Sequence, residues 1–120
     1  METPLDWDRF VSLAGGPGSD VSDVDDLARF YLEHTSEELA ALDAAVRRGM
    51  VADVELIAHR LAGASATAGG QAMVQPLVTL EEMAHAGSIA DAARLVDEAH
   101  AAFGRIRDVL ADRLRIGKRS

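Results

Sequence analysis

Apolar residues recur at helical spacing over most of this chain, and one long stretch of this kind lies between residues 22 and 48. Ser22 and Asp25 resemble a capping box at its start, and Gly49 is a typical stop just after its end. At 100° per residue one face of this stretch carries Val24, Leu27, Ala28, Tyr31, Leu32, Leu39, Leu42 and Val46. The pattern therefore predicts a long amphipathic helix over 22–48.

Four more helices are predicted from the same signals. A short first helix over 3–14 has Thr3 as a candidate cap and Pro4 at its first position. The others are expected over about 51–68, 73–86 and 88–114.

The ends of the last two helices carry their own signals. Gly87 is a typical helix stop, and Ser88 with Asp91 resembles a second capping box. Pro76 lies near the start of the helix over 73–86, and a proline in a helix interior costs about 3 kcal/mol. We therefore expect that helix to start late or to bend there.

Short connections between long amphipathic helices make neighbouring helices antiparallel. Hydrophobic residues, mostly Ala, Leu and Val, form 48% of the chain, whereas aromatic residues form 4%, which suits helices packed closely over a core of small residues. The sequence thus predicts an all-α fold, an up-down antiparallel four-helix bundle with a short additional N-terminal helix. That helix is expected to lie across one end of the bundle through Trp7 and Phe10, and residues 1–120 are expected to form a single domain.

Charge and composition narrow the range of partners and settings. The formal net charge is −8, which repels nucleic acid and anionic membranes, and there is no cysteine for a disulfide or a thiolate metal site. The opening residues METPLDWDRF lack a signal-peptide pattern, and no stretch approaches the roughly 20 apolar residues of a membrane span. We expect a cytoplasmic monomer that binds neither nucleic acid nor membrane.

The stretch IAHRLAGASATAGG at 57–70 places a histidine among small residues. On a helix over 51–68, the side that enters the core carries Val54, Ile57, Ala58, Leu61, Ser65 and Ala68. His59 points to the opposite side. Its neighbours on that side are Ala52, Glu55, Leu56, Ala62, Gly63 and Ala66.

This arrangement predicts an imidazole that another macromolecule can approach. Gly63 in a helix interior lowers helix stability by about 0.5–1 kcal/mol relative to alanine. Because glycine has no side chain, it leaves the surface beside His59 unobstructed. An exposed imidazole on a rigid helix is a nucleophile that can accept a phosphoryl group. We therefore predict that the six neighbours form a docking surface for a partner.

The segment that begins at the histidine carries a spaced set of residues, namely His59, Leu61, Gly63, Ser65, Gly69, Met73, Leu77, Leu80 and Glu81. With them the chain resembles the histidine phosphotransfer (HPt) family, whose pattern is H-x-L-K-G-S-S-x-x-x-G-A, followed by apolar positions before L-E. The likeness extends over about residues 20–114.

The resemblance implies a phosphocarrier rather than a stand-alone enzyme. His59 would accept a phosphoryl group from an aspartyl phosphate on a receiver domain and pass it to another receiver in a two-component phosphorelay. The implied partners are response-regulator receiver domains, a hybrid sensor histidine kinase, or both. The resemblance places Mg²⁺ on the partner receiver, and we expect no cofactor and no metal on this chain.

Three positions depart from the family pattern. Ala62 replaces its lysine, Ala64 replaces the first serine of its pair, and Gly70 replaces the alanine after its second glycine. A lysine at position 62 would offset part of the charge on a phosphorylated His59 ring. Arg60 points about 100° away, and substitutes only if its long side chain curls back. An alternative is therefore an HPt-like scaffold that binds a receiver or kinase without phosphotransfer.

Other chemically capable side chains have plainer interpretations. Glu82 and His85 match the E-x-x-H spacing of metal sites in helical bundles, but both are expected to face away from the core. His34 and His100 are interpreted as surface histidines. Ser65 faces inward, where its hydroxyl can bond to the Leu61 carbonyl.

Phe30 lies outside the apolar stripe of its helix. Either it packs under the N-terminal helix or it offers an exposed anchor to a partner.

Overall fold

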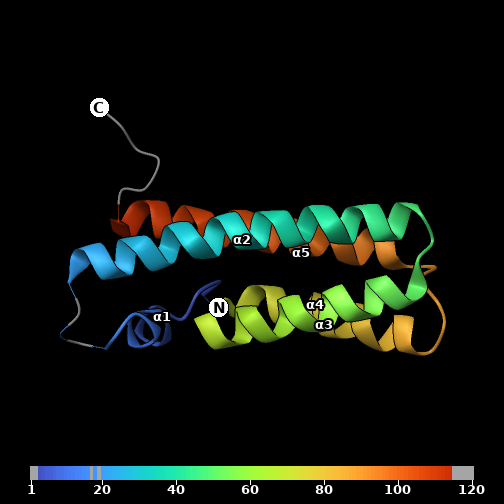
Figure 1. Ribbon diagram of the computed structural model, residues 1–120, viewed down its shortest axis with the longest axis horizontal. Helices are drawn as coiled ribbons and strands as arrows, with labels where there is room; N and C mark the ends of the chain where they lie inside the picture. The colour runs from blue at the N-terminus through green and yellow to red at the C-terminus, as the bar shows by residue number, and fades with distance from the viewer. Residues whose placement is uncertain (1–2, 17, 19, 115–120) are drawn as a thin grey trace.

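The computed structural model describes residues 3–16, 18 and 20–114. The described part of the chain is all-α, as predicted. Figure 1 shows α2 and α5 side by side in one layer, α3 and α4 in a second layer, and α1 at one end of the bundle. The helices are α1 (Trp7–Leu13), α2 (Val21–Arg47), α3 (Val51–Ala68), α4 (Gln71–His85) and α5 (Ala92–Leu114).

Consecutive long helices run antiparallel around one core, in a molecule of 45 × 28 × 26 Å. The pair α3 and α4 makes the most extensive contact. Small side chains on α3, including Ala58, Ala62 and Ala68, let its neighbours approach closely. The largest fully buried side chains are Phe10, Leu39, Leu42, Leu61, Met73, Leu77, Leu80, Ile106 and Leu110.

The first helix begins later than predicted. Its N-cap is Asp6, whose side chain accepts a hydrogen bond from the Arg9 amide at 3.2 Å, so the predicted cap at Thr3 is wrong. The preceding residues pair with the turn between α3 and α4 instead. The Asp6 amide donates to the Gly69 carbonyl at 2.7 Å, and the Ala72 amide donates to the Pro4 carbonyl at 3.2 Å.

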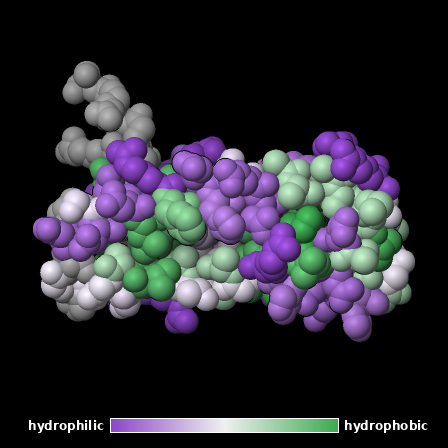
Figure 2. All heavy atoms as spheres, in the orientation of Figure 1, coloured by the Kyte–Doolittle hydropathy of each residue, from purple (hydrophilic) through white to green (hydrophobic). Residues whose placement is uncertain are grey.

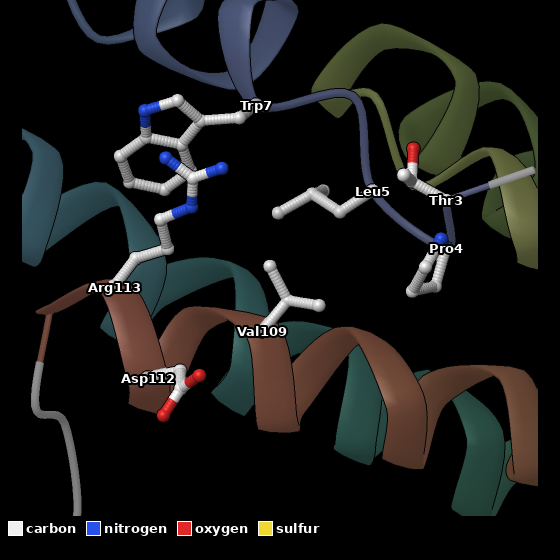
Figure 3. A pocket seen from close by; sticks show the side chains of 7 residues that line it. All are labelled: Thr3, Pro4, Leu5, Trp7, Val109, Asp112 and Arg113. Atoms are coloured by element: carbon white, nitrogen blue, oxygen red, sulfur yellow. The ribbon is translucent and has the colours of Figure 1, made fainter.

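Aromatic side chains hold this N-terminal segment against the bundle, as predicted. Phe10 is fully buried, and the Trp7 ring stacks on it with the two centroids 6.0 Å apart. The guanidinium carbon of Arg113 on α5 lies 4.9 Å from the Trp7 ring centroid. Figure 3 shows these two side chains at the edge of a pocket of about 310 Å³. The N-terminal segment is thus tied to both layers.

The same segment explains why α4 starts early. The helix begins at Gln71, two residues before the predicted 73, because two carbonyls of the N-terminal segment accept hydrogen bonds from its first turn. The Thr3 carbonyl accepts from the Gln71 side-chain amide at 2.6 Å, and the Pro4 carbonyl accepts from the Ala72 amide. Pro76 lies buried inside the helix, so the predicted late start is wrong. The expected bend at Pro76 stays a prediction.

Both predicted capping boxes are also wrong. The N-cap of α2 is Asp20 rather than Ser22, and its carbonyl accepts from the amides of Asp23 and Val24. The last helix begins at Ala92, four residues after the predicted start. Ser88 accepts a hydrogen bond from the Ala90 amide at 3.4 Å and thereby forms a turn before the helix.

The close approach of the N-terminal segment to Gly69 can be tested by substitution. It has φ +85°, and a Cβ there would lie 2.7 Å from the Asp6 carbonyl oxygen, whereas a Cβ on Gly49, with φ +68°, would meet open space. We expect Gly69→Ala to lower the free energy of unfolding by about 1–2 kcal/mol more than Gly49→Ala, because both incur backbone strain but only the first clashes. Urea unfolding of the two variants measures the difference, and equal losses would contradict the close approach.

Candidate functional site

His59 lies near the middle of α3 and points out of the bundle. Its side chain is 70% exposed, while the six predicted core positions of α3 are buried. The predicted orientation is therefore confirmed. A regular helix of 18 residues, closed by Gly69 in the left-handed conformation, fixes the direction of the ring.

One ring nitrogen of His59 is held by the neighbouring helix. Nδ1 lies 2.8 Å from Oε2 of Glu81 on α4. An ionised carboxylate accepts hydrogen bonds and cannot donate one, so Nδ1 carries the proton. In the neutral ring this leaves the lone pair on Nε2. Glu81 thus orients His59 as a nucleophile at Nε2.

The surface beside His59 is low, as the glycine predicted. A Cβ built on Gly63 would meet nothing within 4 Å. Leu56 is 53% exposed, and Ala52 and Ala66 are also exposed. Figure 2 shows the side on which α2 and α3 lie, where apolar areas along the middle are interrupted by polar side chains. The four residues Ala52, Leu56, Gly63 and Ala66 form what we call the histidine rim.

Two of the six predicted docking residues, Glu55 and Ala62, are less exposed than the histidine rim. Ala62 is only 6% exposed, so its prediction as a surface residue is wrong. Ala62 lies seven residues, or about two helical turns, after Glu55 and therefore on the side of α3 that faces α4. The extensive contact between these two helices buries residues on that side as well as those facing the core. Glu55 is half-buried, and its Oε2 lies 2.8 Å from Nδ1 of His85 on α4.

Arg60 is committed to α2. Its guanidinium makes a two-point contact with the Glu38 carboxylate, at 3.1 and 3.2 Å. The side chain therefore points away from His59 and does not replace the family lysine that is absent from position 62. The charged groups near the ring on the α4 side are negative instead. They are the carboxylates of Glu81 and of Glu55, which precedes His59 by one helical turn.

A buried polar cluster supports α3 from below. The Tyr31 hydroxyl lies 3.3 Å from Oγ of the fully buried Ser65, and both oxygens lie 3.8 Å from the Met73 sulfur. Burial raises the pKa of Tyr31 above its ordinary value, and this effect outweighs the lowering by hydrogen bonds to Ser65 and Thr35. Ser65 is thus structural and faces inward as predicted, with Tyr31 as a partner that the sequence did not indicate.

This cluster also accounts for Gly70. A Cβ at that position would lie 2.6 Å from the Tyr31 hydroxyl oxygen and 3.2 Å from Cδ1 of Ile106. An alanine, which the resemblance led us to expect, needs a displaced tyrosine. The departure at Gly70 therefore belongs with the packing of Tyr31.

The remaining candidates lie on the surface. Phe30 is 66% exposed and stacks on the His34 ring with centroids 5.7 Å apart, so the alternative that it packs under the N-terminal helix is wrong. Nε2 of His100 lies 3.0 Å from Asp43. Among the residues that the structure describes, no group of three or more His, Asp or Glu side chains is arranged to hold a metal ion. Within the same residues, no helix is both long and apolar enough to cross a membrane.

Comparisons with known proteins identify a family and a fold. The family model of the Hpt domain matches residues 26–113. The crystal structure of histidine-containing phosphotransfer protein B (HptB) from Pseudomonas aeruginosa PAO1 is similar, with a TM-score of 0.85 and 21% identity, and the match covers 98% of this chain and 100% of that one. At this identity the second likeness shows the fold alone. A comparison with curated proteins gave no match.

Proposed function

The chain belongs to the histidine phosphotransfer (Hpt) family, and we propose that it is a phosphocarrier that takes a phosphoryl group on His59 from a receiver-domain aspartyl phosphate and passes it to another receiver. The observation that carries the proposal is the His59 ring, whose side chain is 70% exposed and whose Nδ1 is held by Glu81. Its partners would be response-regulator receivers, a hybrid sensor histidine kinase, or both, in the cytoplasm.

The transfer step follows from the orientation of the ring. The Nε2 lone pair attacks phosphorus, the bond between phosphorus and the aspartyl oxygen breaks, and the aspartate leaves as a carboxylate. The proton on Nδ1 stays in place, because the positive charge that develops on the ring lies 2.8 Å from the Glu81 carboxylate. Onward transfer reverses these changes at a second receiver.

Charge neutralisation at the phosphoryl group would come from the partner. Arg60 is bonded to Glu38, and Ala62 has no charge to offer. The receiver and its Mg²⁺ would therefore supply the positive charge that phosphoryl transfer needs. This chain would supply the nucleophile and the docking surface. It would be phosphorylated by one receiver and returned to its free form by the next, so it would act as a carrier rather than as a stand-alone enzyme.

The test is incubation with phosphorylated receivers. We expect acid-labile, base-stable phosphate on this protein, because a phosphoramidate on His59 has those properties, and peptide mapping by mass spectrometry should place it on His59. Receiver-dependent label that maps to another histidine would contradict the assignment.

Ala62 favours a second candidate, a scaffold that binds its partner without transfer. In Ala62→Lys the stem would run along the buried edge of α3 and the ammonium would reach solvent beside the ring. An exposed pair of this kind contributes about 0.5 kcal/mol, so we expect a two- to threefold gain in yield or lifetime of phosphorylated His59 at low salt. The gain should shrink as ionic strength rises.

A phosphotransfer time course at two salt concentrations measures this effect. An inert wild-type protein that Ala62→Lys activates would favour the scaffold. Equal rates for both proteins would show that the receiver alone supplies the positive charge.

A further inference from the structure

The arrangement that presents His59 occurs a second time on the same face of α3 and α4. His85, at the end of α4, has its Nδ1 2.8 Å from Oε2 of Glu55, and its side chain is 80% exposed. We propose that His85 is a second phosphoacceptor, with small phosphoryl donors of the phosphoramidate class as its substrates. The proposal rests on the same chemistry as that proposed for His59.

The two sites are related by the antiparallel packing of the helices. Glu55 lies four residues before His59 on α3, and His85 lies four residues after Glu81 on α4. Each histidine therefore bonds to a glutamate of the other helix, and the two pairs are about one helical turn apart. In both pairs the carboxylate holds the proton on Nδ1 and leaves the Nε2 lone pair toward solvent.

The phosphoryl step balances without a further reactant. Phosphoramidate carries a protonated nitrogen on a phosphoryl group. The Nε2 lone pair of His85 would attack phosphorus, the phosphorus–nitrogen bond of the donor would break, and ammonia would leave with its three hydrogens. The ring keeps its Nδ1 proton and becomes a phosphorylated imidazolium, whose positive charge faces the Glu55 carboxylate.

The surroundings of His85 favour a small donor of low net charge. His85 borders an open hollow of about 450 Å³, which is also lined by Val78 and by the carboxylates of Glu55, Glu81 and Glu82. These carboxylates repel a multiply charged donor such as a nucleoside triphosphate. A phosphoramidate carries its own positive nitrogen, so it approaches with less repulsion.

Two other histidines of the chain serve as internal controls. Nε2 of His100 is engaged by both carboxylate oxygens of Asp43, at 3.0 Å. The His34 ring lies parallel to the Phe30 ring, with the two centroids 5.7 Å apart. Neither histidine combines a carboxylate contact at Nδ1 with an available lone pair at Nε2. Labelling of His59 and of His85 should therefore exceed labelling of His34 and His100 by about tenfold.

The experiment treats the wild-type protein with potassium phosphoramidate and quantifies phosphate on each histidine by peptide mapping. Glu55→Gln and Glu81→Gln are a matched pair, because each removes the carboxylate of one site. We expect Glu55→Gln to lower the ratio of His85 label to His59 label about fivefold, and Glu81→Gln to raise it by a similar factor. The ratio is internal to each sample, and far-ultraviolet circular dichroism checks that each variant folds.

The outcomes separate this proposal from that for His59. Label on both residues, with the two opposite changes in ratio, supports both. Label on His59 alone overturns the role of His85 and leaves the phosphocarrier standing. Label at His85 that does not exceed that at His100 and His34, or that ignores Glu55→Gln, overturns the second site. Label on His85 with none on His59 supports the second site and overturns the assignment of Nε2 of His59 as a nucleophile.

Discussion

His59→Gln is expected to abolish phosphorylation of this protein by a phosphorylated receiver. Glutamine has no nucleophilic nitrogen, and removal of a nucleophile that forms the covalent intermediate costs at least about a thousandfold in rate. The side chain is 70% exposed, so its replacement should change the free energy of unfolding by less than about 0.5 kcal/mol. Transfer of radioactive phosphate from a receiver, together with a urea unfolding curve, measures both quantities.

His100→Gln is the matched control for this experiment. That histidine also lies at the surface and bonds to a carboxylate of a neighbouring helix, Asp43 on α2. We expect the control to accept phosphate at the wild-type rate. Receiver-dependent label that persists in His59→Gln would refute the assignment of the phosphoacceptor.

The local pattern of the sequence predicted the helices, and tertiary contacts decided where α1 and α4 begin. The bounds of α3 agree with the predicted 51–68, because an apolar face and a left-handed glycine at 69 define it within one stretch. The starts of α1 and α4 could not be predicted in this way. They depend on backbone hydrogen bonds between Pro4 and Ala72 and between Asp6 and Gly69, residues more than 60 positions apart.

The same distinction applies to the site. The outward direction of His59 follows from the helical periodicity of its own segment. Its hydrogen bond to Glu81 joins residues 22 positions apart, and the bond between Glu55 and His85 joins residues 30 apart. Local spacing cannot reveal such pairs, because they depend on how far α3 and α4 slide along each other. The burial of Ala62 has the same origin.

Gly63→Arg is expected to block phosphotransfer from a receiver while leaving the fold intact. Gly63 lies one turn after His59, and a Cβ there meets open space, so a long side chain is accommodated by the helix but covers the histidine rim. Steric exclusion of the partner should reduce the transfer rate by about thirtyfold or more, as expected when reacting groups cannot reach a productive geometry. Arginine is the better helix former, so the free energy of unfolding should rise by up to about 1 kcal/mol.

Gly63→Ala and a small donor together separate steric blocking from other causes. Alanine adds one methyl group in open space, so this variant should gain similar stability and transfer at close to the wild-type rate. Phosphoramidate needs no docking surface, and it should label His59 in Gly63→Arg as it does in the wild type. If the receiver labels Gly63→Arg at the normal rate, the partner does not dock over the histidine rim. If phosphoramidate labelling of His59 also fails in Gly63→Arg, the arginine disturbs the nucleophile itself rather than the approach of the partner.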